Sequence, residues 1–125
     1  MASRRLGVGV IGSGFNARFH LEAFTGVRDA DVLGIWSPNR ERAGSAAELA
    51  RKLDVGPARA YQSISELVAD PTIDAIWLCG PNHTRVENVE EVCPELQSLA
   101  FRGSKALHQA HVPVVITRAE VAVAR

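Results

Sequence analysis

The sequence has few cysteines, no excess of either charge and no long apolar run, and each of these absences excludes a class of protein. Its 125 residues contain two cysteines, Cys79 and Cys93, too few for the disulfide framework of a small secreted domain. The 14 basic and 14 acidic side chains cancel, so neither nucleic acid nor an anionic membrane surface is an expected partner. No segment approaches the roughly 20 apolar residues that cross a bilayer. We therefore expect a cytoplasmic protein with reduced thiols.

Metal ligands and targeting signals are also scarce. His108 and His111 have the spacing of a metal-binding pair, but no carboxylate or cysteine lies close to them in the sequence, so we expect no metal site. The pair Arg4-Arg5 precedes an apolar run, as in a signal peptide, but several glycines interrupt that run and we interpret it as a first strand. The chain length suits one domain.

A glycine-rich segment near the N-terminus is the most informative feature. Residues 6–11 form an apolar run typical of a strand buried on both faces, and the run breaks at Gly12-Ser13-Gly14-Phe15-Asn16-Ala17. The first glycine would permit a tight turn, the second would let the backbone approach a pyrophosphate, and the small Ala17 would let a helix pack on the strand. The N–H groups at the start of that helix would attract the phosphates. The pattern indicates dinucleotide binding, and the alternative is an ordinary structural turn.

Apolar runs and helical patterns alternate along the first three quarters of the chain. Further strands are expected over 31–37, 58–62 and 74–79, and helices over 15–26, 40–53, 63–69 and 84–93. This order predicts a single α/β domain with a parallel sheet and right-handed crossovers. Ligands of such sheets bind beyond the carboxyl ends of the strands. The glycine turn, Ser37 and the segment 80–83 each follow a strand, so we expect them to meet at one edge.

Local patterns add detail to this arrangement. The segments 63–66 and 84–87 fit capping boxes, in which a Ser or Thr and a Glu satisfy exposed amides at a helix start. Trp36 is expected in the core rather than in a site. The apolar residues of the first helix recur at helical spacing, at Phe15, Phe19, Ala23 and Phe24.

Two motifs together carry a resemblance to a known family. The glycine turn is one, and the other is the segment 73–83, IDAIWLCGPNH, which is similar to a strand ending in a Pro-Asn-His turn. With both, the chain resembles the N-terminal nucleotide-binding domain of the glucose–fructose oxidoreductase, inositol dehydrogenase and MocA family. The resemblance covers about residues 5–93. It implies a Rossmann-type, doubly wound parallel sheet, with residues 1–93 as an NAD(P)-binding core.

The resemblance also implies a set of cofactor-binding residues. Those expected to hold the pyrophosphate are Gly12, Ser13, Gly14, Phe15 and Asn16. Those expected to line the cofactor near the nicotinamide and its ribose are Gly80, Pro81, Asn82 and His83. A turn followed by a helix start uses the same residue types as the second group, so that segment taken alone also fits a purely structural role.

The end of the second strand bears on the choice of cofactor. An acidic residue about 20 positions past the glycines would bind the adenosine ribose 2′-hydroxyl, but serine, Ser37, occupies this place. Asn39, Arg40 and Arg42 follow closely. Without a carboxylate to repel it, a 2′-phosphate could lie near Ser37 and pair with Arg40. The pattern favours NADP over NAD, and the alternative is that the arginines are solvated helix charges.

The C-terminal quarter departs from the family pattern. Members usually carry a Glu-Lys-Pro segment after the fifth strand and then a large substrate domain. Residues 112–116 are a candidate fifth strand here, but Thr117-Arg118-Ala119 follows it. We therefore expect residues 94–125 to be divergent or truncated, and the C-terminal substrate domain to be lacking.

The function expected from the resemblance is an NAD(P)-dependent oxidoreductase acting on a hydroxyl or carbonyl of a sugar or polyol. Because the Glu-Lys-Pro lysine and the second domain are not seen, we name no catalytic residue and expect the chain to be incomplete as a catalyst on its own. The alternative is a non-catalytic dinucleotide-binding module or a remnant fragment.

Overall fold

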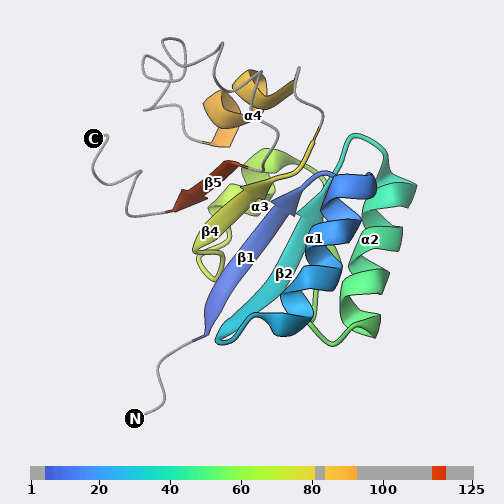
Figure 1. Ribbon diagram of the computed structural model, residues 1–125. Coiled ribbons are helices and arrows are strands. Elements are labelled where there is room, and N and C mark those ends of the chain that lie inside the picture. Colours follow the sequence, from blue (N-terminus) through green and yellow to red (C-terminus); the bar gives the residue numbers. More distant parts are fainter. Residues whose placement is uncertain (1–4, 81–83, 93–113, 118–125) are drawn as a thin grey trace.

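The chain folds into a five-stranded sheet with helices on both faces (Figure 1). The computed structural model describes residues 5–80, 84–92 and 114–117. The strands are β1 (Leu6–Ile11), β2 (Ala30–Trp36), β3 (Arg59–Ala60), β4 (Ala75–Leu78) and β5 (Val114–Thr117). The helices are α1 (Phe15–Ala23), the 3₁₀ turn η1 (Phe24–Gly26), α2 (Arg40–Lys52), α3 (Ile64–Ala69) and α4 (Arg85–Val92). The expected alternation of strands and helices is confirmed.

The strand order is β3-β2-β1-β4-β5, with β1 at the centre. β1 pairs in parallel with β2 and β4, and β2 pairs in parallel with β3, which confirms the Rossmann-type sheet for these four strands. β5 overlaps the candidate strand 112–116, whose first two residues lie outside the described residues, and it runs antiparallel to β4, with Val114 opposite Leu78. Ladder hydrogen bonds form in either direction, so the β-branched run at 114–117 indicates a strand without indicating its direction. An antiparallel edge strand is common on a parallel sheet.

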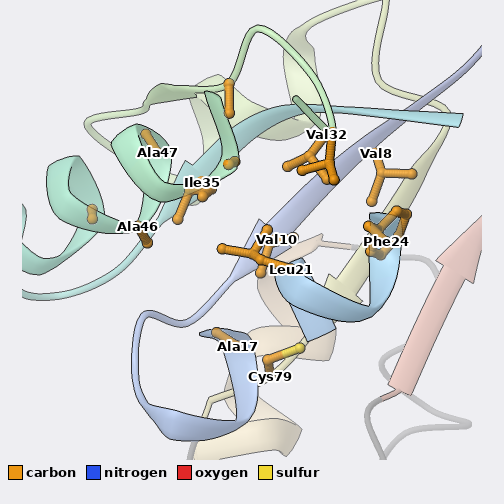
Figure 2. Packing of buried hydrophobic residues seen from close by; sticks show 14 residues of the cluster. Val8, Val10, Ala17, Leu21, Phe24, Val32, Ile35, Ala46, Ala47 and Cys79 are labelled. Carbon is orange, nitrogen blue, oxygen red and sulfur yellow. The ribbon is translucent and has the colours of Figure 1, made fainter. Parts of the chain in front are cut away.

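Apolar side chains form one buried cluster on each face of the sheet. Figure 2 shows the cluster under α1 and α2, where Val8, Val10 and Ile35 lie against the two helices. The buried alanines of α2 let that helix approach the strands closely, and they are Ala43, Ala46, Ala47 and Ala50. The opposite cluster joins Ile11 and residues of β4 to α3 and to Val92 of α4. Trp36 packs against this second cluster and is only partly buried.

The expected apolar face of α1 is wrong at Phe15, Phe19 and Ala23 and is confirmed only at Phe24. Phe15 is 86% exposed and Phe19 is 57% exposed, and their rings stack on the outer surface at a centroid distance of 6.2 Å. The buried residues are Ala17, Leu21 and, in η1, Phe24. The glycine turn fixes the rotation of α1 because the helix starts directly after it, and this rotation brings the small Ala17 over the sheet.

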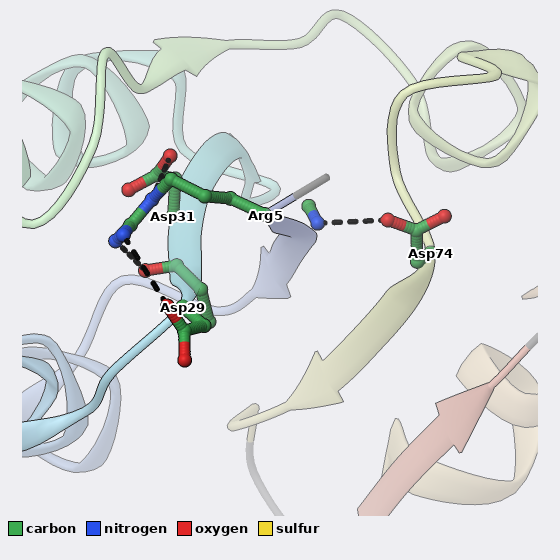
Figure 3. A network of polar contacts seen from close by, with 6 residues as sticks. Arg5, Asp29, Asp31 and Asp74 are labelled. Atoms are coloured by element: carbon green, nitrogen blue, oxygen red, sulfur yellow. Dashed lines mark hydrogen bonds and ion pairs between the residues drawn. The ribbon is translucent and has the colours of Figure 1, made fainter. Parts of the chain in front are cut away.

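Polar contacts fix the amino ends of the strands, opposite the glycine turn (Figure 3). Nε of Arg5 donates to Asp31 at 2.9 Å and joins the start of β1 to β2. The N–H of Gly7 donates to Asp74 at 2.8 Å and joins β1 to the start of β4. No helix within the described ranges is long and apolar enough to cross a bilayer.

A second polar cluster, formed by Arg59, Tyr61, Asp70 and Thr72, closes the β3 edge of the sheet. The Tyr61 hydroxyl donates to Asp70, and the Arg59 guanidinium lies 4.2 Å from the centre of the Tyr61 ring. Thr72 donates to Asp70 from its hydroxyl at 2.5 Å and from its N–H at 2.9 Å. Hydrogen bonds from the Thr72 hydroxyl and then from Tyr61 lower the pKa of Asp70 from 3.8 to about 2.

This lowered pKa predicts a pH-dependent contribution of Asp70 to stability. Because the pKa is below its unfolded value, the contribution is present above about pH 4 and is lost as the pH falls towards 2. We expect Asp70→Asn to lower the free energy of unfolding by about 1–2 kcal/mol at pH 7, with a smaller difference from wild type at pH 2–3. Urea unfolding at both pH values measures this. Glu48→Gln, at an exposed position of α2, is the control, and an equal loss at both pH values would contradict the prediction.

Candidate functional site

A cavity of about 860 Å³ lies beyond the carboxyl ends of β1, β2 and β4. This volume is in the range of small-molecule sites. Of the residues predicted to bind the cofactor, those that line it are Gly12, Ser13, Gly14, Phe15, Asn16, Ser37, Asn39 and Gly80. Arg40 is not among the lining residues, and Pro81, Asn82 and His83 lie outside the described residues. Trp36, expected in the core, contributes to the wall as well.

Gly12 holds the turn at the end of β1. Its φ is +127°, a backbone conformation that favours glycine. A Cβ at this position would lie 2.9 Å from the carbonyl carbon of Cys79. Its N–H donates to the carbonyl of Trp36 at 2.8 Å, and the N–H of Cys79 donates to Ile11 at 2.8 Å. The chain therefore leaves β1 in a narrow space between β2 and β4, where only glycine fits without a shift.

The N-terminus of α1 has neither a side-chain cap nor an acidic residue in its first turn. By contrast, Asn39 caps α2 by accepting from the N–H of Arg42 at 3.1 Å, and Ser63 caps α3 by accepting from the N–H of Glu66 at 3.0 Å. Both of those helices also carry an acidic residue in the first turn. A Cβ at Gly14 would meet nothing within 4 Å, so the space above the turn is open. The open N–H groups and the helix dipole suit an anion.

Part of the first capping box differs from expectation. The N–H of Glu66 donates to Ser63, as predicted, but the Glu66 carboxylate accepts from the N–H of Gln62 at 3.3 Å, one residue earlier than expected. The second box, over 84–87, stays a prediction.

The glycine turn is joined to the end of β2 by a buried hydrogen bond. The hydroxyls of Ser13 and Ser37 are 2.7 Å apart, and the two residues are only 7% and 8% exposed. Both serines were expected in the site, but a pairing between them could not be inferred from the sequence. The bond fixes the relative positions of two segments that line the cavity.

Arg42 lies in the cavity wall and was not selected from the sequence. The cap at Asn39 makes Arg42 the third residue of α2, and side chains of the first helical turn lean back towards the N-terminus. The asparagine cap was the signal that would have favoured Arg42 over Arg40.

One face of α4 forms the wall next to β4, and it was also not selected from the sequence. The residues that line the cavity are Thr84, directly before α4, and Glu87, Asn88 and Glu91 of the helix itself. Their spacing is that of a single helix face, which was the available signal. Asn88 is 9% exposed, and its Nδ2 donates to Oγ1 of Thr84 at 3.4 Å. Within the described ranges, no group of three or more histidine, cysteine or acidic residues could hold a metal ion.

A family model matches most of the chain. It is described as an oxidoreductase family with an NAD-binding Rossmann fold, and it covers residues 6–97. A comparison with curated proteins finds no match.

Several solved structures share the fold. The chain is similar to myo-inositol dehydrogenase from Lactobacillus casei in complex with NAD(H) and myo-inositol, with a TM-score of 0.62 and 27% identity, covering 70% of this chain and 25% of that one. An oxidoreductase from Thermotoga maritima has a TM-score of 0.61 and 25% identity, covering 71% and 26%. Biliverdin reductase from Synechocystis sp. PCC 6803, in complex with biliverdin and NADP⁺, has a TM-score of 0.58 and 22% identity, covering 83% and 34%. The chain thus spans a quarter to a third of these structures.

The local geometry predicts that adding a methyl group at Gly12 destabilises the fold and that adding one at Gly14 does not. We expect Gly12→Ala to lower the free energy of unfolding by about 1–3 kcal/mol, because its Cβ meets the backbone of Cys79 and Gly80 just after β4 and its φ is unfavourable for alanine. Gly14 has φ −83° and open space around it, so Gly14→Ala should stay within about 0.5 kcal/mol of wild type or be slightly more stable. Urea unfolding without ligand compares the two variants. Equal losses for both would contradict the described turn.

Proposed function

The chain belongs to the Gfo/Idh/MocA oxidoreductase family, which has an NAD-binding Rossmann fold, and from this premise we propose that its cavity binds NADP for the oxidation or reduction of a polyol or sugar. The observation that carries the proposal is the N-terminus of α1, which has no side-chain cap and faces open space beside Gly14. By contrast, the N-termini of α2 and α3, which follow β2 and β3, are capped by the side chains of Asn39 and Ser63. An anionic diphosphate is the group that α1 would accept.

The described residues fit a dinucleotide in three parts. The turn 12–16 would hold the diphosphate. Ser37, Asn39 and Arg42 would face the adenosine ribose, because that half of a dinucleotide lies over the end of the second strand. Gly80 and the wall formed by α4 would face the nicotinamide half. Pro81, Asn82 and His83 remain predicted contacts of the same half. The cofactor supplies the hydride chemistry when bound, and the chain binds and orients it.

The preference for NADP is supported by the charges at the end of β2. The position that carries an acidic residue in NAD-binding sites is Ser37, so no carboxylate there repels a 2′-phosphate. Arg42 lines the cavity close by and offers a guanidinium fork for phosphate oxygens. The similar structures include complexes with NAD(H) and with NADP⁺, so the proposal depends on these two residues.

The polyol substrate is supported by the inositol dehydrogenase structure, which is 27% identical over 70% of this chain. The test is the formation of NADPH from NADP⁺ when myo-inositol or another polyol is added, followed by absorbance. The second candidate is a dinucleotide-binding module without turnover. One observation favours it: no lysine or histidine is among the described residues of the cavity wall, although such groups commonly move protons on hydroxyl substrates.

Arg42 and Arg40 provide a matched pair for testing the cofactor. Because Arg42 lines the cavity and Arg40 does not, we expect Arg42→Gln to weaken NADPH binding about tenfold and to change NADH binding little. Arg40→Gln should leave both affinities unchanged. Fluorescence titration of NADPH and NADH measures the four affinities. Tighter binding of NADH than of NADPH by the wild type, or an equal loss of both in Arg42→Gln, would overturn the preference for NADP.

A further inference from the structure

Three polar side chains in the described part of the protein are buried, and all three line the cavity. Ser13 and Ser37 satisfy each other at 2.7 Å. Asn88, on α4, has only a contact from its Nδ2 to Oγ1 of Thr84 at 3.4 Å. Buried polar groups nearly always have their hydrogen bonds made, and a group that lacks some of them calls for an explanation such as a ligand. Asn88 is such a group, because its one hydrogen bond is long.

The side-chain amide of Asn88 has more hydrogen-bonding capacity than its surroundings use. A carboxamide has two N–H donors and an oxygen with two lone pairs, and a contact of 3.4 Å is longer than the usual range for N–H···O bonds. Within the described ranges, no other hydrogen bond to this side chain is present. The Thr84 hydroxyl can donate as well as accept, so either orientation of the amide leaves one of its ends without a partner. Asn88 lines the cavity, so the end of its amide without a partner belongs to a side chain of the cavity wall.

The position of Asn88 identifies which part of a dinucleotide it would meet. In the sheet, β2 and β4 lie on opposite sides of β1. If the diphosphate lies at the turn after β1 and the adenosine half over β2, the nicotinamide half extends towards β4 and α4. A Cβ on Gly80 would lie 3.3 Å from Oγ1 of Thr84 and 3.6 Å from Nδ2 of Asn88, so Asn88 and Thr84 stand directly beside this glycine.

We propose that Asn88 binds the nicotinamide half of the cofactor through its side-chain amide, an inference that rests on the proposed function. The nicotinamide half carries ribose hydroxyls and a carboxamide. These groups both donate and accept, so they can bond to whichever end of the Asn88 amide is open. Asn88 is thereby a cofactor-positioning residue, held in place by the contact with Thr84.

Asn88→Leu separates this role from a structural one. Leucine has the same number and branching of side-chain heavy atoms as asparagine and no polar atoms. Replacing an incompletely hydrogen-bonded buried amide by an apolar group of this shape costs little or stabilises the fold. We expect the melting temperature of Asn88→Leu to equal or exceed that of wild type. A structural amide would instead lower it. Gln62→Leu, the same kind of change at an exposed position away from the cavity, is the matched control, and Asn88→Ala carries the test if the leucine variant does not fold.

Two ligands locate the effect along the cofactor. Calorimetric titration compares NADPH with 2′-phospho-ADP, which keeps the adenosine half and lacks both the nicotinamide ring and its ribose. We expect Asn88→Leu to weaken NADPH binding about tenfold while the affinity for the fragment changes less than about twofold. A variant that binds NADPH as wild type does, or that loses both ligands equally, overturns the role of Asn88. Wild-type protein that binds neither ligand overturns the proposed function itself and the inference with it.

Discussion

The close approach of the Gly12 backbone to the end of β4 is the constraint on which the cavity depends. β1 is the central strand, and its last residues are hydrogen-bonded on both sides, to Trp36 of β2 and to Cys79 after β4. The chain must leave this position by a turn with positive φ and without a side chain. The same turn sets where α1 begins and how it is rotated, so the open helix N-terminus lies between the ends of the two neighbouring strands.

In the described part of the chain, helix starts and strand ends away from the cavity have polar partners within the protein. α2 and α3 are capped by their own side chains, and the amino ends of the strands are joined by Arg5, Asp31 and Asp74. At the carboxyl ends, α1 has no side-chain cap and Asn88 has one long hydrogen bond. A folded chain gains nothing in stability from such groups, and they are the features that a bound dinucleotide would complete.

The alternation of strands and helices and the parallel sheet could be predicted because buried strands, glycine turns and helix caps each leave a local signal in the sequence. The buried face of α1 could not be predicted. Three phenylalanines and an alanine at helical spacing indicated one face, but the turn rotates a different face, with Ala17 and Leu21, onto the sheet. The direction of β5 has no local signal either. In the candidate site, strand ends indicated the glycine turn and Ser37, whereas Arg42 and Asn88 enter the wall through the rotation of α2 and α4.

The hydrogen bond between Ser13 and Ser37 has a consequence for how such a cavity evolves or is redesigned. In dinucleotide-binding sheets, the residue at the end of the second strand contacts the ribose attached to adenine. In this chain the residue there also anchors the loop that would cradle the phosphates. If the chain binds a dinucleotide in this way, an exchange at position 37 would change the residue beside the ribose and the anchor of the glycine turn together.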